Sequence, residues 1–224
     1  MRQDKTTTQQ LAIMETLHEK VDRYYHDFET VYREFDLYTT RFNSSTYHEL
    51  TRYKENHDLN PASLYGVSYA MPASVSQSKC LFVLEMNNTT NQIMGIGLIK
   101  NALAKNQDLT IYSTEKNNAY IYKSNFHVEL RRNDKFDISK HNRKYRSDFY
   151  DYVNEDFREF VENDLEPSCF MGKSHLKRGG SISRYPMKKM NVDILKKIIH
   201  LFVHVNPNNF NDIVMKKFTT NNQE

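Results

Sequence analysis

A basic segment, residues 167–192, has the side chains best suited to chemistry in this sequence. It contains no acidic residue and combines cations, glycines and an aromatic ring. An Arg guanidinium can hold two phosphate oxygens at once, and adjacent glycines let backbone N–H groups approach an anion. We therefore predict that the segment binds a phosphate backbone and stacks a base on its tyrosine. The predicted contact residues are Lys173, Lys177, Arg178, Gly179, Gly180, Arg184 and Tyr185.

A second basic cluster lies between residues 131 and 146. Its predicted phosphate contacts are Arg131, Arg132, Arg143 and Lys144. The nucleic-acid hypothesis requires that both clusters meet on one face of the protein. The alternative for the segment 167–192 is a solvated, flexible loop that balances the acidic helix just before it, since charge runs usually form solvated surfaces.

No catalytic or metal motif is evident. The sequence lacks a Walker loop, a G-x-S-x-G elbow and an H-E-x-x-H helix, so we assign no catalytic residue. His200 and His204 would share a helix face, and Cys169 and His175 could join them. Their spacing is not that of a structural zinc site, and C-x₂-C is absent. We expect neither a metal nor another cofactor.

The composition excludes several classes of protein. The chain has 224 residues, a net charge of +3, 38% hydrophobic and 12% aromatic residues, and two cysteines. This aromatic content argues against wholesale disorder, and two cysteines cannot build a disulfide framework. No signal-peptide core or apolar membrane span is visible, so we expect an intracellular protein, cytoplasmic or nuclear, without a membrane partner.

The N-terminal part, residues 1–45, shows a heptad stripe that predicts one helix from Thr8 to Tyr38. Such a helix would pack on its own domain or pair with a second copy. The residues available for self-association are Met14, Leu17, Val21, Tyr24, Phe28, Val31 and Phe35. Residues 43–61 are polar and turn-rich, with room for a helical turn or two, and we place a boundary there.

The centre of the chain changes to strand patterning. Residues 80–86 form an apolar run typical of a strand covered on both faces, 87–91 have turn chemistry, and 92–99 form the return strand. Gly95 and Gly97 inside this strand indicate a bulge, a sharp bend or a close approach to the backbone. Further strands are predicted at 109–113, 119–123 and 126–130.

The C-terminal part returns to helical patterning. One helix is predicted over 149–165, with an acidic outer face and Pro167 as its end, and another over Val192–Val205. We therefore divide the chain into the N-terminal helix (1–45), a central β domain with packed C-terminal helices (60–205) and a polar tail (206–224).

The segment Cys80–Ile99 resembles the central hairpin of PUA-like domains, above all those of the YTH and EVE families. There, an apolar strand, a polar turn and a strand ending in a Gly-x-Ala/Gly step follow one another. The resemblance implies a small, partly open β-barrel that holds a modified or flipped base. YTH domains use a cage containing Trp, which this chain lacks. Tyr65 and Tyr69 are the substitute stacking candidates, and ordinary packing is the alternative for both.

The fold expected is α+β: a small mixed β-barrel or bent sheet with a long N-terminal helix and a helical C-terminal part. The function predicted is a non-catalytic nucleic-acid-binding module, for RNA or single strands, with recognition of a modified base as a refinement. The alternative is a structural or adaptor protein that assembles through its N-terminal helix. Low Gly with high Asn and Lys favours an AT-rich coding source, such as a large DNA virus.

Overall fold

The computed structural model describes most of the chain between Phe35 and Val205. The described ranges are 35–60, 62–104, 109–132, 135–136, 155–178, 182–190 and 192–205. The predicted polar tail and residues 1–34 of the predicted N-terminal helix lie outside these ranges, so the division into three parts stays a prediction.

A five-stranded mixed sheet forms the centre of the protein, in the order β6-β4-β3-β1-β9. Its strands are β1 (Phe35–Phe42), β3 (Cys80–Asn87), β4 (Gln92–Ile99), β6 (His127–Glu129) and β9 (Ser183–Arg184). β1 and β3 are parallel, and the other neighbours in the sheet are antiparallel. The described residues thus form an α+β fold, as predicted, with an open mixed sheet and not the β-barrel that was one of the two expected arrangements.

Two smaller sheets accompany the central one. β2 (Ser63–Val67) pairs with β5 (Tyr120–Ser124), and β7 (Arg131–Arg132) pairs with β8 (Lys135–Phe136), both antiparallel. The helices are α3 (Ser44–Asn56), α5 (Glu166–Phe170) and α6 (Val192–Val205), with 3₁₀ turns η2 (Glu115–Asn118) and η5 (Met187–Lys189). Residues 155–160 and the π-helical turn η4 (Val161–Leu165) continue directly into α5.

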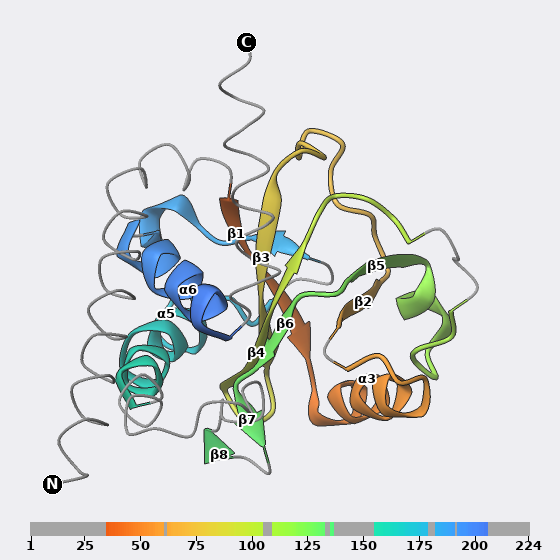
Figure 1. Ribbon diagram of the computed structural model, residues 1–224, viewed down its shortest axis with the longest axis horizontal. Helices are drawn as coiled ribbons and strands as arrows, with labels where there is room; N and C mark the ends of the chain where they lie inside the picture. The colour runs from red at the N-terminus through yellow and green to blue at the C-terminus, as the bar shows by residue number, and fades with distance from the viewer. Residues whose placement is uncertain are drawn as a thin grey trace, which may run out of the picture.

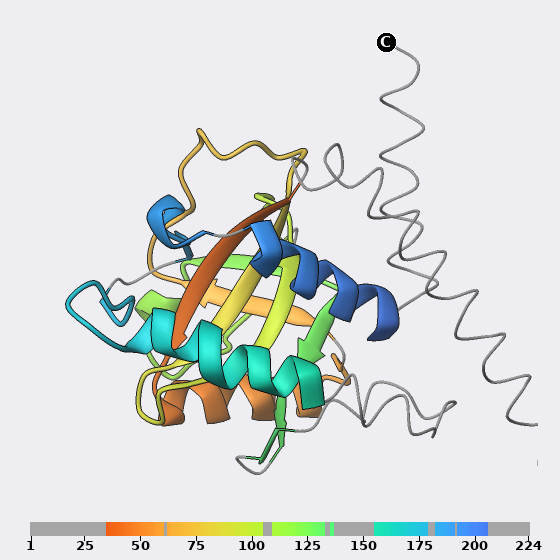
Figure 2. The same ribbon diagram turned by 90° about the vertical axis from the view of Figure 1, so that its left-hand side faces the viewer.

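The sheet is covered on both faces, which explains why β3 is apolar at nearly every position. Figure 1 shows α5 and α6 on one side of the sheet, and α3, β2 and β5 on the other. In the view turned by 90°, α5 and α6 lie side by side across the strands (Figure 2). Phe82 and Leu84 pack toward these helices, whereas Leu81 and Val83 belong to the core beneath α3. The prediction of a strand buried on both faces is confirmed.

The central hairpin is where the sequence predicts the structure best. β3 and β4 pair as expected, with register shifted by one residue between Glu85 and Met86, as a β-bulge produces. Asn91 in the turn has a φ of 59°, the left-handed conformation that Asn tolerates. Predicted strands at 119–123 and 126–130 correspond to β5 and β6. The segment 109–113 is a loop, because Asn118 Oδ1 accepts the N–H groups of Ile111 and Tyr112, both at 3.0 Å.

The prediction that the N-terminal helix extends to Tyr38 is wrong for its last residues. Phe35–Phe42 is β1, which pairs with all eight residues of β3. Phe35 is buried, and its ring stacks on Phe82 with a centroid distance of 5.1 Å. Phe35 therefore packs in the protein's own core and is not exposed for self-association, while the other six residues of that set lie outside the described residues.

Two helices also differ from expectation. α3 is longer than a turn or two, because Asn43 and Thr46 form a reciprocal capping box at its start. Pro167 does not end the preceding helix, which continues to Phe170. In the π-helical turn, the N–H of Glu166 donates to Val161 O, and Pro167 then sits in the first turn of α5, where its missing N–H costs little. α6 has the predicted bounds.

Candidate functional site

The basic segment includes most of α5, the edge strand β9 and η5, and reaches the start of α6. Lys173, Arg178 and Lys188 are exposed, and none of them forms an ion pair with another described residue. The side chain of Arg184 is 51% exposed, and its Nη2 lies 3.0 Å from Asp36 Oδ1. Of the predicted cations of this segment, only Arg184 is thus partly neutralised by a described carboxylate.

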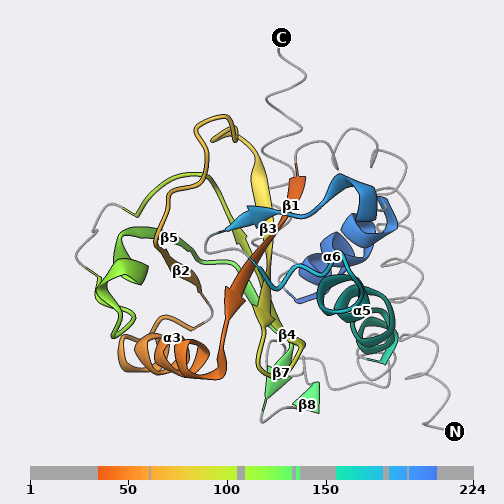
Figure 3. The same ribbon diagram turned by 180° about the vertical axis from the view of Figure 1, so that it is seen from behind.

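The sheet anchors this segment through polar contacts. Arg41 on β1 donates through Nε to Leu176 O and through Nη1 to Ser183 Oγ, the latter at 3.2 Å. Asn88, at the end of β3, donates to Lys177 O at 2.9 Å. In the view from behind, the chain from α5 passes over this side of the sheet before it returns as β9 (Figure 3). The cations are therefore carried on a backbone that is fixed at several points.

Some predicted contacts in this segment serve the core instead. Tyr185 is completely buried, and its hydroxyl lies 2.7 Å from Ser168 Oγ. Its ring has no exposed face for a base, so the stacking role assigned to it does not fit this structure. Lys177 is half-buried, with Nζ 5.9 Å from the centroid of the Phe170 ring. Gly179 and Gly180 lie outside the described residues.

Within the second basic cluster, the described structure places Arg131 in an internal ion-pair network. Its Nη2 lies 2.8 Å from Glu166 Oε1 and 3.3 Å from Glu162 Oε1, and only 4% of its side chain is exposed. Arg131 therefore connects β7 to the acidic residues of η4 and α5, and its guanidinium is not available to phosphate. Arg132 lies on β7, whereas Arg143 and Lys144 lie outside the described residues.

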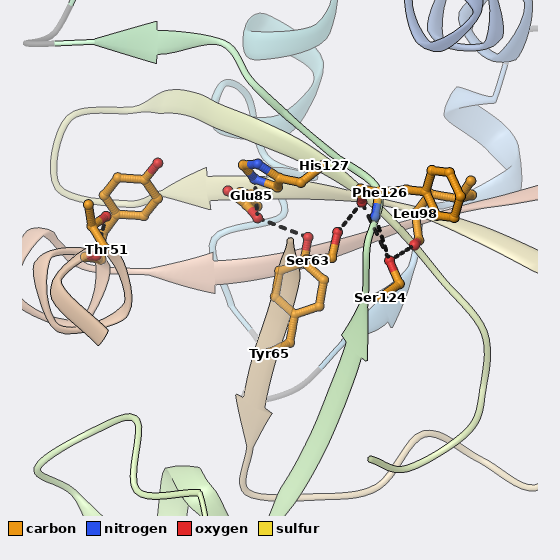
Figure 4. A network of polar contacts seen from close by, with 9 residues as sticks. Thr51, Ser63, Tyr65, Glu85, Leu98, Ser124, Phe126 and His127 are labelled. Carbon is orange, nitrogen blue, oxygen red and sulfur yellow. Dashed lines mark hydrogen bonds and ion pairs between the residues drawn. The ribbon is translucent and has the colours of Figure 1, made fainter. Parts of the chain in front are cut away.

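A buried polar network that the sequence did not predict lies between the central sheet and the α3 side. Its centre is Glu85 on β3, of which 1% is exposed. Glu85 Oε1 accepts a hydrogen bond from the Tyr65 hydroxyl at 2.9 Å and lies 2.9 Å from His127 Nε2. Figure 4 shows Tyr65 and His127 converging on this carboxylate from β2 and β6. A buried carboxylate needs such partners, because an unpaired one is very costly.

Gly95 and Gly97 make room for this network. A Cβ at Gly95 would stand 2.7 Å from Glu85 Oε2 and 2.8 Å from His127 Nε2. At Gly97 it would collide with the Tyr65 hydroxyl and Ser63 Oγ. The close approach that these glycines indicated is therefore made by the protein's own polar side chains. They were the one signal in the sequence that could have led to the network.

Electrostatic interactions within the network shift the pKa values of its members. Burial raises the pKa of the Glu85 carboxyl, but the nearby charge and hydrogen bond of His127, with Lys54 and the Tyr65 hydroxyl, hold that pKa below its usual value. Burial and the Glu85 charge raise the pKa of Tyr65 and of Tyr112, so both hydroxyls stay protonated. None of these side chains has more than 7% exposure, so none of them can contact a ligand in this arrangement.

The two stacking candidates differ in their accessibility. Tyr65 is fully buried in the network, whereas Tyr69 is 60% exposed, with Lys116 Nζ 5.3 Å from its ring centroid. The described residues contain no group of three His, Cys, Asp or Glu side chains placed to hold a metal ion. Cys80 and Cys169 are both buried, and burial raises the pKa of the Cys169 thiol to about 12.

No helix in the described ranges combines the length and the apolar character that a bilayer span requires. No family model matches this chain, and neither a curated protein nor a solved structure is significantly similar to it.

Proposed function

We propose that this chain is a nucleic-acid-binding module that holds the phosphate backbone with its basic segment. The observation that carries the proposal is that Lys173, Arg178 and Lys188 are exposed and form no ion pair with a described residue. Phosphate binding by such cations releases counterions, which supplies most of the affinity for nucleic acids of any sequence.

The anchoring of the segment supports the same proposal. Contacts from Arg41 and Asn88 fix its backbone to the central sheet. Cations on a fixed backbone lose less conformational entropy on binding than cations on a free chain. We propose binding without catalysis, since Glu85, His127 and Tyr65 are buried and cannot touch a nucleic acid in this arrangement.

Preference for RNA or single strands, and recognition of a modified base, are finer parts of the proposal. They rest on the resemblance of Cys80–Ile99 to PUA-like hairpins. In this structure only Tyr69 of the two stacking candidates offers an exposed ring, so a base that stacks on the protein through a tyrosine would meet Tyr69 first.

Fluorescence anisotropy with a labelled single-stranded oligonucleotide, titrated over a range of salt concentrations, tests the proposal. The triple variant Lys173→Gln, Arg178→Gln, Lys188→Gln should bind more weakly. The slope of log K against log salt should decrease in magnitude by about 2, because each lost contact to a single strand removes about 0.7. The melting temperature should stay unchanged, since these side chains are exposed.

A matched control separates a local site from general charge. Arg52→Gln, Lys100→Gln, Lys123→Gln removes the same charge from exposed positions on other parts of the fold. This control should keep the wild-type salt slope. Equal losses in both triple variants, or absence of salt-dependent binding by the wild-type protein, would refute the proposed function.

A further inference from the structure

The two most exposed large apolar side chains among the described residues both belong to the basic segment. Met171 is 66% exposed and Met187 is 62% exposed. Phe170, Ile182 and Tyr185 of the same segment are buried. Leu176 and Met190 are partly buried, so the two most exposed apolar side chains of the segment are thioethers that have cations near them in the sequence.

Ser168 connects the two stretches of chain that carry these methionines, because it precedes Met171 in α5 and contacts residues on both sides of Met187. Met171 directly follows α5, and its N–H donates to Pro167 O at 3.0 Å. Met187 begins η5 and lies between two residues that contact Ser168. The Tyr185 hydroxyl lies 2.7 Å from Ser168 Oγ, and Lys189 Nζ donates to Ser168 O at 2.5 Å. The stretches that carry the two exposed thioethers thus meet at Ser168, where α5 contacts the chain that follows β9.

We infer that Met171 and Met187 pack against the faces of unpaired bases, and that the basic segment thereby selects single strands over duplexes. The inference rests on the proposed nucleic-acid function and adds the residues that determine strandedness. A thioether is polarisable and packs favourably against aromatic rings. A single strand can present its base faces, whereas a duplex keeps them stacked and presents mainly phosphates.

The buried position of Tyr185 strengthens this assignment. The aromatic ring that the sequence offered for stacking is in the core, so it cannot supply the apolar contact. The cations alone would hold the phosphates of either form. Discrimination between the two forms needs side chains that favour base faces, and the two methionines are the most exposed large apolar groups in the described part of this segment.

The test measures binding to three ligands of about 12 nucleotides, a length within the site sizes of single-strand-binding domains. They are a single-stranded oligonucleotide, the same sequence as a duplex, and a phosphodiester of equal length without bases. Met171→Gln with Met187→Gln keeps side-chain length and net charge. It should weaken single-strand binding about tenfold and leave the salt slope unchanged. Binding to the duplex and to the abasic ligand should not change.

Lys173→Gln is the comparison variant, because it should lower affinity for all three ligands and reduce the salt slope. Unchanged single-strand affinity in the double methionine variant would overturn the inference while leaving the proposed function intact. Equal or tighter binding of the duplex by the wild-type protein would also overturn the inference and leave the proposed function intact. Failure of the wild-type protein to bind any of the ligands would refute the proposed function, and the inference with it. Unchanged melting temperatures would show that the variants are folded.

Discussion

The hydroxyl of Tyr65 occupies the space that a Cβ at Gly97 would fill. Tyr65 comes from β2 and Gly97 from β4, so the contact joins the small two-stranded sheet to the central one. The absent side chain lets the Tyr65 hydroxyl reach Glu85 Oε1, which it meets at 2.9 Å. A glycine that weakens its own strand is therefore what allows a buried carboxylate to be satisfied.

Gly97→Ala should destabilise the protein by about 1–3 kcal/mol, since the added methyl group must displace fully buried atoms of Tyr65 and Ser63. Urea unfolding measures the change. The same substitution in a Tyr65→Phe background should cost less, because the colliding hydroxyl is gone. Equal costs in both backgrounds would show that the Tyr65 hydroxyl does not limit the space at Gly97.

Glu85→Gln should lower the free energy of unfolding by about 1–2 kcal/mol near neutral pH, because hydrogen bonds to a charged acceptor are stronger than those to an amide. The folded protein holds the pKa of Glu85 below its unfolded value. Its contribution is therefore fully present above the unfolded pKa, about 4.3, and is lost as the pH falls through the folded pKa.

Urea unfolding of both proteins at pH 7 and at pH values below 4 checks this prediction. The difference between wild type and Glu85→Gln should shrink at the lower pH values, because protonation makes Glu85 neutral as well. The other carboxyl groups titrate in both proteins and cancel in the difference. A difference that grows as the pH falls would mean that burial dominates and that the carboxyl is neutral in the folded state.

What the sequence predicted correctly depends on local patterns. The hairpin of β3 and β4 is set by neighbouring residues, and its turn places Asn91 in the left-handed conformation. β1 was missed because its heptad spacing imitates a helix, and only pairing with β3, far along the chain, makes it a strand. Tertiary context overrode the local pattern there.

The same contrast between local patterns and long-range contacts applies to the candidate sites. Exposure of Lys173 and Arg178 could be predicted from the polar character of their segment. The partners of Arg131, Glu162 and Glu166, are more than 30 positions away, and no spacing rule connects them. The Glu85 network likewise assembles residues of three strands, and Gly95 and Gly97 indicate that something approaches without identifying it.

Tyr112→Phe and Tyr122→Phe should differ in their effects on stability, although both hydroxyls belong to buried tyrosines. The Tyr112 hydroxyl has at most a poorly aligned contact with the Gly66 backbone, whereas the Tyr122 hydroxyl accepts the Met71 N–H at 2.9 Å. Removing the first should be neutral or stabilising, because a buried unsatisfied group is costly. Removing the second should cost about 1–3 kcal/mol by leaving an N–H unpaired. Thermal and urea unfolding of the two variants, measured side by side, decide the point.

Arg131→Ala should destabilise the protein by about 3 kcal/mol, because removal of one partner from a buried ion pair leaves the other charge uncompensated. The lower end of the range for buried pairs is expected, since Glu162 is 40% exposed and can be hydrated, while Glu166 is 13% exposed. Arg178→Ala, at an exposed position, should change stability by less than about 0.5 kcal/mol.

In nucleic-acid binding the order should reverse: Arg178→Ala should lower the salt slope, and Arg131→Ala should leave it unchanged under conditions where both variants are folded. Urea unfolding and salt titration of the two variants therefore separate the structural arginine from the phosphate-binding one. An Arg131→Ala variant that is as stable as wild type but has a reduced salt slope would return Arg131 to the binding surface.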